Sequence, residues 1–161
     1  ESGLSSKCGC VWSSSVIVIS GRAPGYFLAW PAGERRTAQC YLRDLYPTAC
    51  DLAGIPIPPT AEGRSLVPAL SGKAESVYPF VVGYFQDSQR MIRTDRWKFI
   101  RYPKLDKEQL FDLTADRHEL RDLADDPRHA QLRAQLRADL NSWLRDHGDP
   151  LQIASTATNS P

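Results

Sequence analysis

The chain has 161 residues, of which 42% are hydrophobic and 24% are charged, enough for one domain with a hydrophobic core. This composition excludes an intrinsically disordered chain, and the net charge of +1 gives no bulk attraction for a polyanion. No apolar run approaches the roughly 20 residues that cross a bilayer, so we expect no membrane partner.

The first third of the chain predicts little regular structure. Residues 1–15 are rich in Ser and Gly without any period, and we expect them to be a disordered or damaged start. The continuous β-branched run at residues 16–19 predicts a buried strand. Residues 21–33 carry two prolines and three glycines, which predicts a loop.

A first helix is predicted over residues 45–53. Asp44 is suited to cap its amino end, and Gly54 is suited to the C′ position after its last turn. The proline-rich residues 55–59 must be extended, because a proline disfavours helical geometry in the residue before it. A short turn of helix is expected within residues 65–70.

The period then changes toward two. Strands are predicted at residues 81–85, 90–93, 97–102 and 110–113, and their short links favour an antiparallel sheet.

A second, long helix is predicted after Asp126 and Pro127, which suit the N-cap and the first helical position. Leucines recur every four residues on one face, and Gly148 then ends the helix. The predicted fold class is therefore α+β, a small antiparallel sheet of about four strands packed by a long C-terminal helix. Residues 151–161 are expected to be a frayed tail.

Basic residues alternate with aromatic residues in the hairpin Arg90–Arg101. Such a pattern can bind a polyanion, and a polyanion-binding or interaction module built on this hairpin is one candidate function. The other interpretation is a solvated strand face whose arginines pair with nearby carboxylates: Asp87, Asp95, Asp106 and Glu108. Because the chain has no net basic excess, we expect no nucleic-acid partner.

No catalytic or metal-binding residue can be assigned from local motifs. The acidic run between Asp112 and Asp126 lacks the spacing of an EF-hand, and Asp112 is expected to hydrogen-bond its own turn. The cysteines form one Cys-x-Cys pair and two distant residues, whereas structural zinc sites usually show two spaced pairs. We therefore expect free thiols at Cys8, Cys10, Cys40 and Cys50, the last two partly buried around a helix.

Four motifs occur in a recognisable order. Residues 44–55 read Asp-Leu-Tyr-Pro-Thr-Ala-Cys-Asp-Leu-Ala-Gly-Ile, and residues 62–70 contain Gly-Arg-Ser-Leu-Val-Pro. Residues 90–98 carry Arg-x-Ile-Arg-Thr and then Trp-Lys, and residues 110–124 begin with Leu-Phe-Asp-Leu and end with Asp-Leu-Ala. Together they resemble the C-terminal part of the sulfatase family.

The resemblance implies a domain organisation. Residues 31–75 would be the end of the main domain, a stub of the α/β alkaline-phosphatase-like sulfatase domain. Residues 76–150 would be the C-terminal subdomain. Residues 1–30 would be an unmatched start, in which only residues 16–21 resemble the family's last main-domain strand. Arg117 and Asp122 stand where the family usually has Pro and Asn. The apolar face of the first helix would then lack the large sheet that it covers, so we expect an exposed patch: Leu45, Ala49, Leu52 and Ile55.

The family hydrolyses sulfate esters with formylglycine and calcium. Formylglycine derives from the Cys or Ser of a Cys/Ser-x-Pro/Ala-x-Arg motif, which does not occur in this sequence. We therefore expect a C-terminal fragment, or a separately encoded subunit, without catalytic or metal residues of its own. The resemblance implies a sulfated small molecule or glycan as the full-length substrate, bordered here by Gln86, Asp87 and Arg90. A plain surface hairpin tip is the alternative for these three residues.

Overall fold

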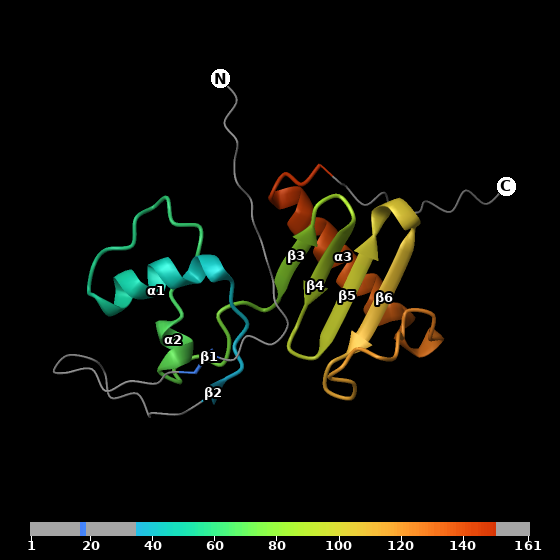
Figure 1. The fold of residues 1–161 in the computed structure, drawn as a ribbon, viewed down its shortest axis with the longest axis horizontal. Coiled ribbons are helices and arrows are strands. Elements are labelled where there is room, and N and C mark those ends of the chain that lie inside the picture. Colours follow the sequence, from blue (N-terminus) through green and yellow to red (C-terminus); the bar gives the residue numbers. More distant parts are fainter. Residues whose placement is uncertain (1–16, 19–34, 151–161) are drawn as a thin grey trace, which may run out of the picture. The chain divides into compact units, whose positions relative to one another are not determined.

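A computed structural model describes residues 17–18 and 35–150 (Figure 1). The predictions for residues 1–15, 21–33 and 151–161 lie outside the described residues, as do Cys8 and Cys10. Two compact units divide the chain, Glu1–Val81 and Val82–Pro161, and each is described by itself.

The first unit contains a short two-stranded sheet and two helices. Strand β1 (Ile17–Val18) lies inside the predicted run and pairs antiparallel with β2 (Arg35–Arg36), which was not predicted. The 3-10 helix η1 (Leu42–Asp44) leads directly into α1 (Leu45–Leu52). Helix α2 (Val67–Leu70) confirms the short turn of helix expected there.

Helix α1 ends as its sequence predicts. Gly54 has a positive φ of 67°, and the amide of Ile55 donates to the carbonyl of Cys50 at 2.9 Å. The amide of Gly54 donates to the carbonyl of Asp51 at 3.2 Å, which completes a Schellman motif. Cys50 is buried and is a free thiol, as expected, and Cys40 is half-buried.

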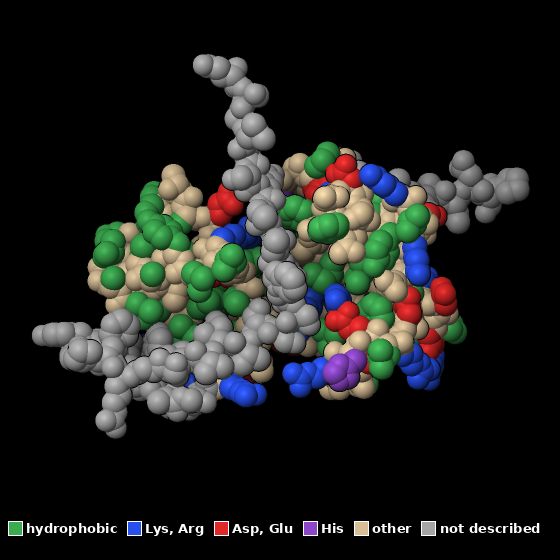
Figure 2. All heavy atoms as spheres, viewed as in Figure 1, with side chains coloured by type: hydrophobic (Ala, Val, Ile, Leu, Met, Phe, Trp, Pro, Cys, Tyr) green, Lys and Arg blue, Asp and Glu red, His purple; other side chains and the backbone are tan. Residues whose placement is uncertain are grey.

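The outer face of α1 is apolar and exposed. Leu45 and Ile55 are 57% and 58% exposed, Ala49 is exposed and Leu52 is half-buried, which confirms the predicted patch in all but Leu52. Leu42 and Tyr46 extend it, and Figure 2 shows hydrophobic side chains gathered over this helix. Burying apolar surface stabilises by about 25 cal/mol per Å², so packing another apolar surface against this face would be favourable.

The second unit is a four-stranded antiparallel sheet in the order β3-β4-β5-β6 (Figure 1). Its strands are β3 (Val81–Phe85), β4 (Gln89–Arg93), β5 (Trp97–Tyr102) and β6 (Lys107–Asp112). Strands β3 and β5 have the predicted bounds, whereas β6 begins three residues earlier than predicted. The 3-10 helix η2 (Pro103–Leu105) and Asp106, with a φ of 47°, connect β5 to β6.

Helix α3 (Ala130–Asp146) packs on one face of this sheet, as predicted. The 3-10 helix η3 (Pro127–His129) precedes it, and the Asp126 carboxylate caps η3 by accepting from the amide of Arg128 at 3.0 Å. The strand register aligns Ile92, Phe99 and Leu110, all 0% exposed, under Leu136, Leu140 and Leu144 of the helix. These buried side chains form the core of the α+β unit, each worth about 1.5–3 kcal/mol of burial.

The carboxyl end of α3 is also fixed by a glycine. Gly148 has a φ of 63°, and the amide of Asp149 donates to the carbonyl of Leu144 at 2.9 Å. The amide of Gly148 donates to the carbonyl of Arg145 at 3.1 Å, so this end is a second Schellman motif. The motif sets the position of Asp149 relative to the helix.

Candidate functional site

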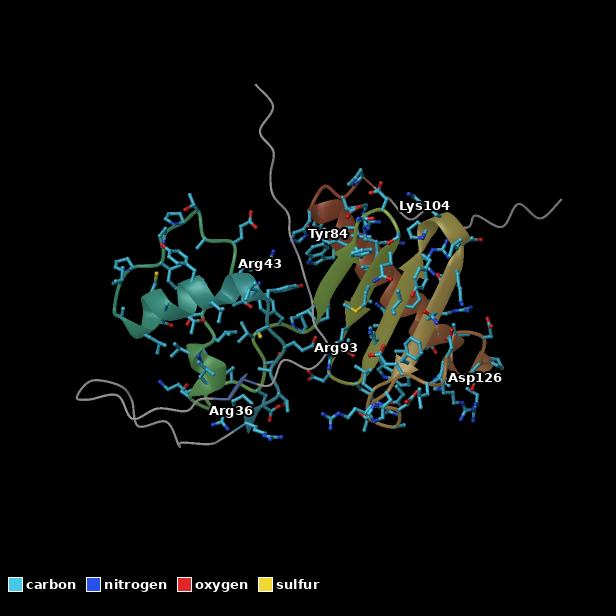
Figure 3. All side chains as sticks on the ribbon, viewed as in Figure 1. Arg36, Arg43, Tyr84, Arg93, Lys104 and Asp126 are labelled. Carbon is cyan, nitrogen blue, oxygen red and sulfur yellow. The ribbon has the colours of Figure 1, made fainter. Side chains whose placement is uncertain are left out.

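The tip of the β3-β4 hairpin is held by a buried arginine. The Arg90 side chain is 3% exposed, and its guanidinium forms a bidentate pair with Asp149. Its Nε donates to Oδ2 at 2.9 Å and its second terminal nitrogen donates to Oδ1 at 3.1 Å. The ring of Tyr84, labelled in Figure 3, lies 5.4 Å from this guanidinium. The pair therefore joins the hairpin to the end of α3.

The same guanidinium also binds the backbone of the tip. One terminal nitrogen of Arg90 donates to the carbonyl of Gln86 at 2.6 Å and to that of Gln89 at 2.9 Å. Gln86 has a φ of 45°, a left-handed conformation that non-glycine residues seldom adopt. The amide of Ser88 closes the turn on the carbonyl of Phe85 at 3.1 Å. These bonds fix the backbone while Gln86 and Asp87 remain exposed.

The structure thus separates the three residues expected at a substrate rim. Gln86 and Asp87 lie exposed at the tip, whereas Arg90 is buried beneath it and its charge is matched by Asp149. Sequence reasoning missed Asp149. Its place after Gly148 could have been read from the helix-ending pattern, but its partner lies 59 residues away along the chain. Whether the tip meets a substrate stays a prediction.

Most cations of the basic hairpin are paired with carboxylates. Arg96 binds Asp112 with two nitrogens, at 3.1 and 2.7 Å to Oδ2, and Lys98 binds Glu119 at 2.6 Å. Arg101 pairs with Asp106 and Glu108, as expected from the sequence. These ion pairs reduce the net charge that the hairpin presents, and the polyanion-binding function stays a prediction.

Asp112 is the most strongly engaged of these carboxylates. Besides Arg96, it accepts from the amides of Thr114 and Ala115 at 3.1 and 3.3 Å, which confirms the expected bond to its own turn. The hydrogen bonds from Arg96, followed by those from the two amides, hold the pKa of Asp112 below its ordinary value.

A second buried carboxylate organises the first unit. Asp44 is 0% exposed and accepts from the amides of Tyr41 and Arg64, at 2.6 and 2.9 Å, and from the Tyr78 hydroxyl at 2.6 Å. Asp44 is the N-cap residue of α1, as predicted, but its side chain makes no capping hydrogen bond to that helix. Burial, and then the bond to Asp44, raise the pKa of Tyr78.

The Asp44 cluster has a structural function and is not a reactive centre. Its oxygens are filled by donors from three separate segments and no solvent reaches them. The Thr48 hydroxyl continues the network, accepting from the amide of Leu66 at 2.9 Å. The cluster therefore connects the start of α1 to the segment that leads into α2.

The described residues do not assemble a metal site. Among residues 17–18 and 35–150, no three His, Cys, Asp or Glu side chains lie close enough together to hold an ion. Within the same part of the chain, no helix combines the length and the apolar character needed to cross a bilayer.

The comparisons with known proteins all point to one family. Residues 26–146 match the family described as N-sulphoglucosamine sulphohydrolase, C-terminal. The chain is 38% identical over 109 residues to a Delta 4,5-hexuronate-2-O-sulfatase of Bacteroides thetaiotaomicron, covering 63% of this chain and 23% of that protein. It is 42% identical over 92 residues to a choline-sulfatase of Rhizobium meliloti, covering 53% of this chain and 18% of that protein.

A solved structure agrees with the sequence comparison. A 2-O GAG sulfatase superposes with a TM-score of 0.57 at 35% identity, covering 66% of this chain and 25% of that structure. The chain thus spans about a quarter of the length of such relatives. The matched part is the carboxyl-terminal region of the family, as the four motifs predicted.

Proposed function

The chain belongs to the sulfatase family, and we propose that it forms the C-terminal subdomain of a sulfate-ester hydrolase without carrying the hydrolytic centre itself. In this proposal, the α1 face packs against the main domain and the hairpin tip borders the substrate. The substrate class is a sulfated small molecule or glycan.

The observation that supports a rim function is the fixed hairpin tip. Arg90 binds two tip carbonyls and Asp149, so the tip is held in place before any ligand arrives. A rigid loop loses less conformational entropy on binding than a mobile one. The exposed Gln86 amide and Asp87 carboxylate supply the donors and acceptors that sugar hydroxyls require.

In this proposal Arg90 is a positioning residue. Its guanidinium is occupied by Asp149 and two carbonyls, which leaves the contact with substrate to Gln86 and Asp87. We expect loss of Arg90 to act through the tip backbone and not through a lost bond to sulfate.

Formylglycine and calcium are not assigned to this chain. The sequence lacks the Cys/Ser-x-Pro/Ala-x-Arg motif, and the described residues bring no metal-binding cluster together. Since these residues fit neither group, both belong to the full-length proteins of the family.

A chimera tests the proposed function. The segment of the Delta 4,5-hexuronate-2-O-sulfatase that matches this chain would be replaced by residues 38–150, and sulfate release would be measured. We expect an active chimera. Gln86→Ala and Asp87→Ala should then each raise KM while kcat changes little, because they remove contacts with bound substrate. Arg121→Ala, an exposed residue outside the tip, is the matched control.

The outcomes separate the two parts of the proposal. A folded but inactive chimera would contradict the assignment as an equivalent subdomain. An active chimera in which both tip variants keep the parental KM would remove the rim function and leave only a bracing function.

A further inference from the structure

A polar pocket lies beside the sheet edge in the second unit, apart from the hairpin tip. It has a volume of about 530 Å³ and is lined by residues of β5, β6, α3 and the loops beside them. Pockets of a few hundred Å³ are the size that holds small ligands such as a sugar unit. Arg101, Arg133 and Arg137 contribute three guanidiniums to it.

These three arginines share one buried carboxylate. The Glu108 side chain is 9% exposed, and its oxygens meet Arg101 at 3.5 Å, Arg133 at 3.7 Å and, more closely, Arg137. A second carboxylate, Asp106, also binds Arg101, but its side chain is 74% exposed and its charge is screened by water. The three guanidiniums therefore share two carboxylates, of which only Glu108 is shielded from water.

Hydrogen-bond donors exceed acceptors in this cluster. Each guanidinium carries five N–H groups and no acceptor. The Nε atoms of Arg101 and Arg137 are buried without a hydrogen-bond partner, and both belong to the described part of the chain. Buried donors without partners are rare in native proteins, and each one calls for an explanation. Both Nε atoms are closed to solvent, so a ligand in the pocket would meet the terminal N–H groups of Arg133 and Arg137, whose side chains are 30% and 31% exposed.

The remaining acidic residues of the lining lie at its outer part. Asp122 and Asp125 are both exposed, and Oδ1 of Asp122 already accepts from the amides of Leu110 and Ala124 at 3.0 Å each. Lys107 adds a fourth cation to the lining. The lining therefore carries four cations and four carboxylates, and three of these carboxylates are exposed and more strongly screened by solvent than Glu108.

We propose that this pocket binds an oxyanion, either inorganic sulfate or the sulfate group of a sugar. Sulfate presents several acceptor oxygens to the fork of N–H groups that arginine offers. Leu105, 73% exposed at the rim, offers an apolar surface against which a sugar ring can pack. This site is separate from the hairpin tip and binds without any chemical step.

Titration of the whole chain with sodium sulfate tests the proposal. The arginine Nε–H signals would be followed by NMR, with sodium chloride at matched ionic strength as the reference. We expect saturable shifts for Arg101 and Arg137 with sulfate alone. A heparin-derived disaccharide forms a second arm: tighter binding than sulfate identifies a sulfated sugar as the source, and equal binding identifies inorganic sulfate. Either result supports an oxyanion pocket.

Substitutions that change the charge of the pocket should change the affinity for sulfate in opposite directions. Arg137→Gln should weaken sulfate binding about tenfold, the usual effect of one charge-assisted hydrogen bond. Glu108→Gln should tighten it, because the carboxylate that competes for the arginines becomes neutral. Arg128→Gln is the matched control, since Arg128 is 74% exposed, precedes the same helix and pairs with Asp126 outside the pocket. If Arg137→Gln fails to fold, the partly exposed Arg133→Gln replaces it.

Two results would overturn the proposal. One is a set of shifts that sulfate and chloride produce equally. The other is a folded Arg137→Gln or Arg133→Gln protein that binds sulfate as tightly as the parent chain. Because the measurement needs no turnover, its failure would leave the proposed function untouched.

Discussion

Asp149 meets Arg90 at the carboxyl end of α3, and the Schellman motif at Gly148 decides where its carboxylate lies. The position of the β3-β4 tip thus depends on how a helix 59 residues later ends. Because Arg90 also holds the carbonyls of Gln86 and Gln89, this single pair connects the helix end to the tip backbone.

Asp149→Ala should destabilise the second unit by about 3–5 kcal/mol, because it leaves a buried guanidinium without its counter-charge. Arg90 is only 3% exposed, so water cannot replace the lost carboxylate. Urea unfolding followed by circular dichroism measures the change. The control is Asp146→Ala, which removes an exposed carboxylate at the last residue of α3. Equal unfolding midpoints for the two variants would show that the pair contributes little.

The regular elements were predictable because their signals are local. The leucine spacing of α3, the alternation in β5 and the glycines at positions 54 and 148 are all read within a few residues. Strand β2 was missed, since two arginines carry no apolar alternation and their pairing with β1 depends on a distant segment.

Tyr78→Phe should cost the first unit about 1–3 kcal/mol, because the buried Asp44 carboxylate loses a hydrogen-bond donor. Tyr46→Phe, 57% exposed, is the control and should change stability by less than about 0.5 kcal/mol. Thermal unfolding of the three proteins side by side makes the comparison. A Tyr78→Phe protein as stable as the control would contradict the assigned function of Asp44.

The same tyrosine predicts a pH dependence. Its pKa in the native state lies above the ordinary value of 10.0, so the native state keeps a proton that the unfolded chain releases. The stabilisation is complete below pH 10 and is lost as pH rises toward the native pKa. The stability difference between the parent and Tyr78→Phe should therefore shrink above about pH 10. A constant difference across that range would argue against a raised pKa.

Gly63→Ala should also disturb the Asp44 cluster. An added Cβ would lie 2.4 Å from the Arg43 carbonyl oxygen and 3.0 Å from the Asp44 Cα, both backbone atoms that cannot move cheaply. We expect a loss of about 3 kcal/mol by overpacking. Gly54→Ala is the comparison: it meets no atom within 4 Å but has a φ of 67°, so we expect about 1 kcal/mol. The reverse order in chemical denaturation would contradict this account.

The interactions of the candidate sites were less predictable than the elements. Asp44 has the local pattern of a helix cap, yet its partners Arg64 and Tyr78 lie 20 and 34 residues away. Glu108 was expected to pair with the hairpin, and Arg101 does bind it, but Arg137 reaches it from a helix 29 residues away. Such pairings depend on how the elements pack against one another, and no local sequence pattern predicts that packing.

The stability that Asp112 contributes should depend on pH in the opposite sense to that of Tyr78, and Asp112→Asn tests this. Arg96 holds the native pKa of Asp112 below its ordinary value, so the stabilisation is present at neutral pH and declines as pH falls through the native pKa. The variant should be less stable than the parent at pH 7, with the difference narrowing below about pH 4. Acid unfolding curves followed by tryptophan fluorescence provide the measurement, and a gap that widens on acidification would contradict the sign.

We propose that this chain is a sulfatase subdomain without a hydrolytic centre. The most direct test is hydrolysis of a chromogenic aryl sulfate by the purified chain with added calcium, beside a full-length relative as the positive control. We predict no turnover above background for the chain while the relative is active. Calcium-dependent turnover that follows the folded chain through purification would contradict the claim, because it would require a nucleophile within these 161 residues.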